Sequence, residues 1–267
     1  MRRVIVTSVL AALVAAGTGT PAIAADPKEA LARARTLYNE RKFESAIAAA
    51  EEGRAFPELA DSADLVVARS YLERYRESAS PEDLNNARER LRRLDPQRLS
   101  GRERMEFVVG LGAALFFDGS AGAAAEIFES VLASFEITFD ARERVLDWWA
   151  SALDRDVRPR SEFARQEVYT KIRERMRSEI GAHPGSGVAA YWMAAAAAGQ
   201  ADWQAAWDAA LAGWVRAPLG TDYGESLRAD LDRLMSRAIA PERAKAISVP
   251  PEFLLGEWEQ FKERWKR

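Results

Sequence analysis

The chain contains no cysteine. This absence excludes disulfide bonds, thiol catalysis, thiolate metal sites and lipid attachment to a cysteine. Histidine is almost absent too, because His183 is the single one. A zinc site with several histidines is therefore excluded, and a catalytic triad would have to use this one residue as its base. Nothing near His183 marks a nucleophile, so we interpret it as a loop residue between two helices.

The chain also lacks an apolar run long enough to cross a bilayer near its start. Residues 4–16 are apolar except for Thr7 and Ser8, whereas a spanning helix needs roughly 20 apolar residues. A short basic segment precedes this run, and the small residues Ala22 and Ala24 follow it. This order is typical of a signal peptide, with an uncleaved anchor as the alternative. We expect residues 1–25 to be removed and the protein to be exported, periplasmic or secreted, with no stable membrane insertion afterwards.

An excess of basic residues is missing as well. The chain has 38 Lys and Arg residues against 41 Asp and Glu residues, and loss of the signal peptide would remove Arg2 and Arg3. A mildly acidic balance argues against nucleic acid as the main partner. Residues of both signs are mixed along the helical segments, which is typical of solvated helix faces.

The chain also lacks runs of alternating β-branched residues, which would signal a half-buried strand. Residues that favour helices fill most of it. Prolines and glycines divide it into segments that suit single helices. The predicted pairs of helices are 28–40 with 43–54, 61–77 with 81–94, 102–117 with 121–134, 140–153 with 161–180, and 188–198 with 203–215. Two further helices are predicted at 224–238 and 252–265.

The second helix of each predicted pair has a small or apolar residue at a similar place. These residues are Ala46, Leu84, Ala124, Ala164 and Ala206. They recur about every 40 residues, which is the length of a two-helix unit with its loops. A small residue there allows the two helices of a pair to pack closely. We therefore expect an all-α fold built from repeated pairs.

The clearest copy of the pattern lies at residues 105–136, where Leu111 and Gly112 precede Gly119, Ala124 and Phe128. Partial copies at 28–57 and 188–218 add Tyr38, Phe43, Ala46 and Pro57, and Trp203, Ala206, Ala210, Gly213 and Pro218. In these residues the chain resembles the tetratricopeptide repeat (TPR) family. The unit of that family has 34 residues, so the longer loops here depart from it, and another α-solenoid remains an alternative.

The resemblance implies a right-handed α-solenoid of about five helix pairs at 26–220, with C-terminal capping helices at 221–267. It also implies a groove lined by the first helix of each pair, which holds a peptide or a partner helix. Arg35, Asn39, Phe116 and Phe117 fall at or near inward-facing positions, so they are the candidate partner-binding residues. Packing against a neighbouring repeat is the alternative for the two phenylalanines.

Motifs for catalysis and cofactor binding are absent. Gly110 and Gly112 form a G-x-G inside a predicted helix without the third glycine of a dinucleotide site, so we interpret them as helix-packing residues. There is no P-loop and no G-x-S-x-G elbow. Acidic pairs such as Asp230 and Asp232 suit exposed helix faces. We therefore predict no catalytic residue, no cofactor and no metal site.

The tryptophans are concentrated in the second half, and all eight lie between Trp148 and Trp265. They pack between repeats or form an aromatic groove wall. The last helix has an apolar stripe of Leu254, Trp258, Phe261 and Trp265, which either docks on the end of the array or contacts a partner or a membrane surface.

The sequence therefore predicts an exported, non-enzymatic protein that binds a protein or peptide in the cell envelope, as an adaptor or scaffold. Two alternatives stay open. One is an enzyme that acts on cell-wall polymer, which would need a cleft containing a carboxylate of raised pKa. The other is a structural subunit of an envelope assembly.

Overall fold

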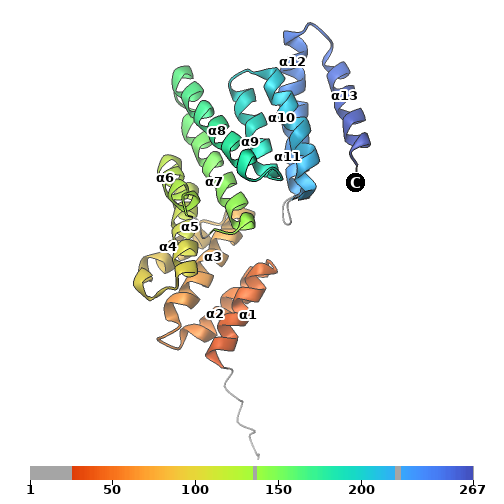
Figure 1. The fold of residues 1–267 in the computed structure, drawn as a ribbon. Coiled ribbons are helices and arrows are strands. Elements are labelled where there is room, and N and C mark those ends of the chain that lie inside the picture. The colour runs from red at the N-terminus through yellow and green to blue at the C-terminus, as the bar shows by residue number, and fades with distance from the viewer. Residues whose placement is uncertain (1–25, 135–136, 220–223, 267) are drawn as a thin grey trace, which may run out of the picture.

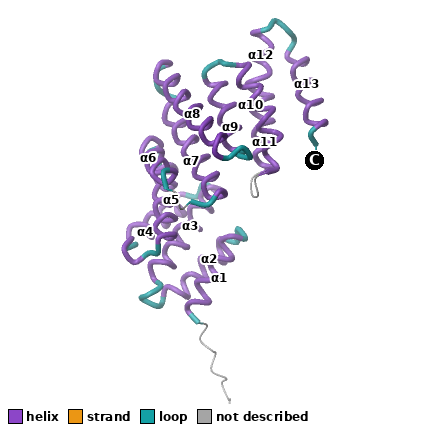
Figure 2. Tube along the Cα trace, viewed as in Figure 1, coloured by secondary structure: helices purple, strands orange, loops and turns teal. Residues whose placement is uncertain are grey.

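The computed structural model of the chain describes residues 26–134, 137–219 and 224–266. The predicted signal peptide, residues 1–25, lies outside this part. Within the described residues every regular element is a helix and none is a strand (Figure 2), which confirms the predicted all-α class.

The helices follow one another in chain order along an elongated body, from α1 at the bottom of Figure 1 to α13 at the upper right. Their bounds are α1 (Pro27–Asn39), α2 (Phe43–Arg54), α3 (Ala60–Ser78), α4 (Pro81–Arg93), η1 (Pro96–Arg98), α5 (Gly101–Phe117), α6 (Ala121–Leu132), α7 (Phe139–Val157), α8 (Glu162–Ala182), α9 (Gly187–Gly199), α10 (Trp203–Arg216), η2 (Ala217–Leu219), α11 (Gly224–Leu234), η3 (Met235–Ile239), α12 (Ala240–Ala246) and α13 (Pro251–Arg264).

The predicted helix at 224–238 is too short. Helices α11, η3 and α12 continue without a break through Pro241, which the sequence had marked as a helix end. Proline normally stops a helix because it lacks an N–H and its ring clashes with the carbonyl four residues back. Here the turn just before it widens to a π-helix, in which the Ala240 N–H donates to the Met235 carbonyl five residues back. The wider turn accommodates the ring.

Helices pack in adjacent pairs, with α1 on α2, α3 on α4, α5 on α6 and α9 on α10. The first helices of successive pairs also contact one another, in the order α1, α3, α5, α7, α9, α11. We call these six the A helices, and α2, α4, α6, α8 and α10 the B helices. The A helices therefore form one continuous layer. We call the surface of this layer that points away from the B helices the A-helix face.

The pair α7 and α8 is the exception. Helix α7 packs mainly on α6, and α8 packs mainly on α9, so these two helices contact each other less closely than the helices of the other pairs. The small residue expected at this position follows the same trend: Ala46, Leu84, Ala124 and Ala206 are buried, whereas Ala164 on α8 is only half-buried. The sequence pattern predicts that α7 and α8 pack closely at Ala164, and in the structure these two helices do not.

The turns inside four of the helix pairs, and the turn between α12 and α13, share one backbone conformation. A residue with positive φ joins α1 to α2, α3 to α4, α5 to α6, α9 to α10 and α12 to α13, and these residues are Arg41, Ala79, Gly119, Ala201 and Ser248. The left-handed conformation ends one helix and reverses the chain for the next. The turn between α7 and α8 has no such residue, in agreement with its looser packing.

The core is a series of clusters along the array rather than one centre. Apolar side chains are buried between α1 and α3, between α3 and α5, between α5 and α9, and between α9 and α13. Glycine permits the closest contact: a Cβ at Gly112 would lie 2.6 Å from the Phe128 ring, and that ring is fully buried. This confirms the interpretation of Gly112 as a helix-packing residue.

Helix α13 docks on the end of the array. Its Leu254 and Trp258 are 1% exposed, and Trp258 packs edge-on against Trp214 of α10 with 5.2 Å between ring centroids. Two of the predicted stripe residues thus belong to the core, and the third, Phe261, is half-buried against the same cluster. Trp265 at the end of the stripe is 43% exposed.

Among the described helices, none is both long enough and apolar enough to span a bilayer.

Candidate functional site

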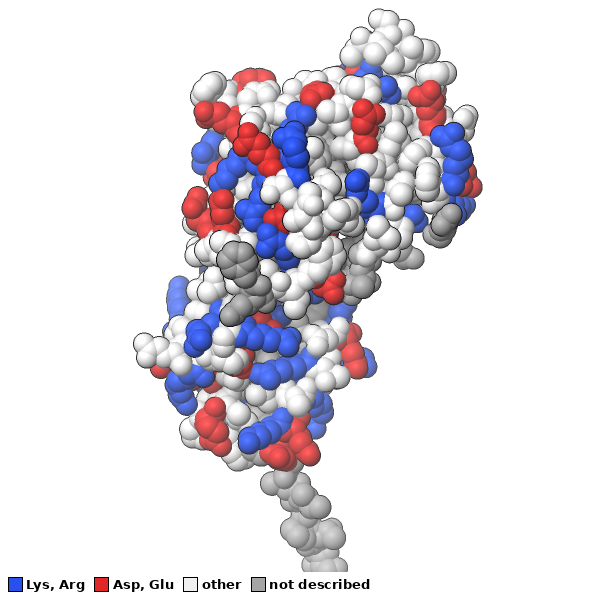
Figure 3. Space-filling model, viewed as in Figure 1, with Lys and Arg blue, Asp and Glu red and all other residues white. Residues whose placement is uncertain are grey.

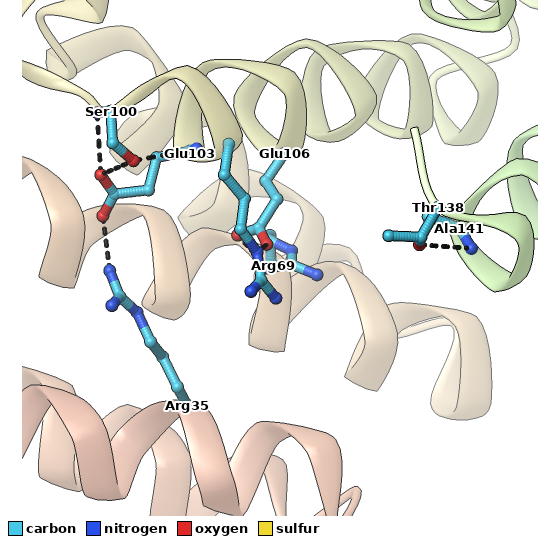
Figure 4. A network of polar contacts seen from close by, with 8 residues as sticks. Arg35, Arg69, Ser100, Glu103, Glu106, Thr138 and Ala141 are labelled. Carbon is cyan, nitrogen blue, oxygen red and sulfur yellow. Dashed lines mark hydrogen bonds and ion pairs between the residues drawn. The ribbon is translucent and has the colours of Figure 1, made fainter. Parts of the chain in front are cut away.

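The A-helix face carries polar side chains that reach from one A helix to another. The Arg35 guanidinium of α1 lies 2.5 Å from the Glu103 carboxylate of α5, so this ion pair crosses over α3 (Figure 4). Burial raises the pKa of Glu103, but hydrogen bonds from Ser100 and from Ser62 of α3, with the charge of Arg35, outweigh it and lower the pKa overall. Three A helices thus converge on one carboxylate, which requires the layer to curve toward this face.

A second bridge lies beside the first. Arg69 of α3 is 2.5 Å from the Glu106 carboxylate of α5, and its guanidinium stacks 4.4 Å from the ring of Tyr38 on α1 (Figure 4 shows Arg69 and Glu106). Burial raises the pKa of the Tyr38 hydroxyl, and the positive charges of Arg69 and Arg144 partly oppose this effect. Arg144 belongs to α7, so the charge of the fourth A helix acts on a side chain of the first.

Aromatic side chains fill the space between α3, α5 and α7. Phe117 packs edge-on against Tyr75, and Phe116 and Phe117 both pack edge-on against Trp148, with ring centroids 4.8 to 5.4 Å apart. The Arg155 guanidinium covers Phe116 at 4.5 Å. All four rings are only half-buried. Such edge-on contacts stabilise the stacking of neighbouring pairs and leave part of each ring open to a partner.

The carboxylate of Asp147 on α7 lies further along the same layer. The indole N–H of Trp192 on α9 donates to it at 2.8 Å. Asp147 is exposed to solvent, yet α3, α9 and α11 surround it closely enough for desolvation to raise its pKa. Asp230 of α11 raises the pKa further, while the Trp192 hydrogen bond and the charge of Arg76 on α3 oppose the shift.

Tyr191 extends this part of the face onto α9. Desolvation together with the negative charges of Asp230, Asp147 and Asp154 raises the pKa of its hydroxyl to about 12. Its ring packs edge-on against Trp192, with 5.4 Å between the centroids. The A-helix face therefore has two electrostatic regions. Arginine–glutamate pairs join the helices over α1 to α5, whereas over α7 to α11 Asp147 has no ion-pair partner among the described residues and Asp230 pairs with Arg233 of its own helix.

The four residues predicted to bind a partner lie on A helices, but the structure does not bring them together as one cluster. Arg35 is half-exposed and paired with Glu103, and Asn39 is exposed at the last turn of α1. Phe116 and Phe117 are adjacent members of the aromatic cluster, and both pack against neighbouring helices. Their role in binding stays a prediction.

Other parts of the described chain offer little chemistry. His183 is the C-cap of α8, as the sequence predicted for a loop residue, and its ring lies 5.5 Å from Phe139. A shallow pocket beside it is lined by Arg142, which Glu179 already neutralises. Within the described residues no group of three or more His, Cys, Asp or Glu side chains is arranged to hold a metal ion.

Sequence reasoning missed Tyr38, Arg69, Asp147 and Tyr191 as members of this face. Tyr38 had entered only as a residue of the repeat pattern. The usable signal was the position of each residue within its A helix. Arg144 and Asp147, for example, are three residues apart and therefore share one helix face. Trp192 and Asp147 are 45 residues apart in the sequence, so only the packing of α7 on α9 brings them together.

Comparison with known proteins gives no relative, since no protein family, curated protein or solved structure matches this chain. The functional argument therefore depends on the chain's own geometry and chemistry.

Proposed function

We propose that the chain is an exported, TPR-like protein that binds a segment of a protein partner along the A-helix face and acts as an adaptor or scaffold of the cell envelope. The fold would be a right-handed α-solenoid of about five helix pairs with a C-terminal cap. One observation supports this most directly: polar groups from α1, α3, α5 and α7 meet across a curved layer while many stay accessible to solvent.

The physical basis is a preformed surface. Ion pairs that join separate A helices hold the curvature before any partner arrives, so little conformational entropy remains to be lost on binding. The face presents charges of both signs and half-buried aromatic rings, a composition that suits a polypeptide with mixed side chains. Figure 3 shows the same mixture of Lys, Arg, Asp and Glu over the visible surface, without one extended region of a single sign.

The proposal can be tested with two matched variants. Asn39→Arg places a bulky charge on the A-helix face, and Asn85→Arg places the same charge on the exposed surface of the B helix α4. Purified chains would be titrated into solubilised envelope extract, and captured proteins would be measured by quantitative mass spectrometry. We expect saturable capture of a partner by the wild type and by Asn85→Arg, and at least a tenfold loss with Asn39→Arg. Equal capture by all three, or no saturable partner, would contradict the proposal.

Export would be tested separately. Cells that express the full chain should release it by osmotic shock with a new N-terminus near Ala25, and removal of residues 1–25 should retain it in the cytoplasm. An unprocessed chain in the membrane fraction would instead support an uncleaved anchor.

An enzyme is the second candidate, because Asp147 has the raised pKa that general acid catalysis uses and accepts a hydrogen bond from the Trp192 indole. Incubation with purified cell-wall polymer distinguishes the two functions. Release of soluble fragments that is lost in Asp147→Asn would support catalysis. Binding without turnover would support the adaptor.

A further inference from the structure

Among the described residues, two aspartates accept a hydrogen bond from a tryptophan indole, and one of them shows what completes such a pair. The Trp258 indole N–H donates to Asp232 at 2.8 Å, and the Lys262 ammonium lies 2.6 Å from the same carboxylate oxygen. The ammonium is also 5.6 Å from the Trp258 ring centroid and 5.8 Å from that of Trp214. Glu259 lies 2.6 Å from the same ammonium, so aromatic rings and carboxylates together hold one primary ammonium group.

Asp147 and Trp192 repeat the first half of this arrangement. The indole N–H of Trp192 donates to the Asp147 carboxylate at the same distance, 2.8 Å, and a second aromatic ring, Tyr191, packs against the indole. The cation is missing, because no Lys or Arg among the described residues forms an ion pair with Asp147. Arg76 of α3, whose positive charge acts on Asp147, is itself paired with Glu73 at 2.8 Å.

Most enclosed carboxylates among the described residues have a cation beside them. Glu143 of α7 is an exception, because it accepts hydrogen bonds from the Ser186 hydroxyl and the Val188 N–H instead. Asp64, Asp83 and Glu179 are all buried, and each forms an ion pair with arginine at 3.2 Å or less. On the A-helix face, Glu103 and Glu106 are paired with arginines of other A helices. Burial of a carboxylate without a cation destabilises a fold, and Asp147 avoids the full cost because it stays exposed to solvent. Desolvation raises the pKa of Asp147, whereas hydrogen bonds from Lys262 and Trp258 outweigh desolvation and lower the pKa of Asp232.

We propose that Asp147 and Trp192 form a receptor for one primary ammonium group, supplied by a lysine side chain of the polypeptide that lies along the A-helix face. This inference rests on the proposed function and specifies the partner: its bound segment carries a lysine opposite α7 and α9. The Trp192 indole fixes the carboxylate, and Asp147 supplies the charge, whereas the nearby Asp230 of α11 is already paired with Arg233.

The indole N–H of Trp192 provides a direct probe in the intact protein. The ¹⁵N-labelled chain would be titrated with acetyl-Ala-Ala-Lys-Ala-Ala-amide, and with the same peptide carrying Met or Glu in place of Lys. We expect the lysine peptide alone to shift the Trp192 indole resonance in a saturable way. The Trp258 resonance should stay in place, because Lys262 already occupies its site. A Trp192 shift that is equal for the Lys and Met peptides, or absent with all three, would overturn the receptor.

The variant Asp147→Asn keeps the size of the side chain and an acceptor for Trp192 but removes the charge. We expect it to abolish the lysine-dependent shift and to raise the melting temperature at neutral pH, since the unneutralised carboxylate is gone. An unchanged shift in this variant would overturn the proposal. The wild-type titration stands by itself should the variant fail to fold.

Capture from envelope extract separates this inference from the proposed function. Loss of the partner with both Asp147→Asn and Asn39→Arg supports the lysine receptor. Loss with Asn39→Arg but full retention with Asp147→Asn overturns the receptor and leaves the groove function standing. No saturable partner with the wild type removes the function itself.

Discussion

Glu179 shows how a single buried carboxylate stabilises the junction of α7 and α8. It is 4% exposed, and Arg142 of α7 donates two hydrogen bonds to it, at 2.8 and 2.5 Å, while Arg175 of α8 donates a third at 2.9 Å. Burial by itself raises the pKa of Glu179, but the two arginines outweigh it and hold the pKa below its usual value of 4.5. The pair α7 and α8 packs more loosely than the other pairs, and this ionic contact joins its two helices beside the apolar cluster that they share.

Replacing Glu179 by Gln removes the charge and leaves Arg142 half-buried without its counter-ion. We expect the free energy of unfolding at pH 7 to fall by about 3 kcal/mol, the range measured for breaking buried ion pairs. The folded-state pKa of Glu179 is lowered, so its stabilisation is present above the unfolded pKa and is lost as the pH falls through the folded pKa. The difference between wild type and variant should therefore shrink below about pH 4.5.

Glu263→Gln is the matched control, because Glu263 and its partner Lys266 are both exposed. Its effect should stay below about 0.5 kcal/mol at every pH. Urea unfolding at pH 7 and pH 3 measures both variants. A Glu179→Gln effect of the same size at the two pH values would show that the loss is steric rather than electrostatic.

At the scale of elements, the turns within pairs decide how the helices meet. Only one of the five left-handed positions is a glycine, and a residue with a Cβ is disfavoured in this conformation. Ala79 closes α3 with φ 54°, and Gly119 follows α5 with φ 87°. A Cβ at Gly119 would meet no atom within 4 Å, so substitution there tests backbone conformation alone.

Exchanging the residues at these two turns should give effects of opposite sign. Ala79→Gly should stabilise the chain and Gly119→Ala should destabilise it, each by about 1 kcal/mol. A Cβ in the left-handed region costs free energy, and the greater flexibility of a glycine in the unfolded chain offsets part of that cost. Thermal unfolding of the two variants beside the wild type measures this. Destabilisation by both substitutions would show that the turn at Ala79 does not depend on its backbone conformation.

The sequence predicted these elements well where local signals agree. Segment 43–54 has the bounds of α2, and most other predicted helices differ from the structure by only a few residues at each end. The prediction failed at Pro241, because a π turn that absorbs a proline has no sequence signature of its own. It also placed Ala164 in a close helix contact, although α8 packs mainly on the following helix.

At the scale of the whole molecule, the candidate site is less predictable than the fold. The residues around Asp147 come from α3, α7, α9 and α11, and their meeting depends on the curvature that accumulates over several pairs. A repeat pattern specifies which side chains lie on the A-helix face, but the angle between successive pairs depends on loops and contacts that differ from pair to pair. The sequence therefore identified Arg35 on this face without its partner on α5.

That curvature gives a last prediction, which concerns two arginines of α1. Arg33 and Arg35 are equally exposed, at 50%, and each lies 2.5 Å from a glutamate. Arg33 pairs with Glu52 of α2, inside its own helix pair, whereas Arg35 pairs with Glu103 across α3. Arg33→Glu should cost about 1 kcal/mol or less, as expected for an exposed ion pair, and Arg35→Glu should cost more, because the Glu103 side chain is 12% exposed. Only Arg35→Glu should open the layer of A helices.

Because the chain has no cysteine, two introduced cysteines would be its only labelling sites, and Asn39 on α1 and Glu126 on α6 are exposed positions for spin labels. We expect the distance distribution between them to lengthen and broaden in Arg35→Glu and to stay unchanged in Arg33→Glu. Salt at 1 M should lengthen it in the wild type as well, because screening then acts within about 3 Å. If the distribution is the same in all three chains, apolar packing between pairs sets the curvature, and the bridge over α3 is a consequence of the groove rather than a cause of it.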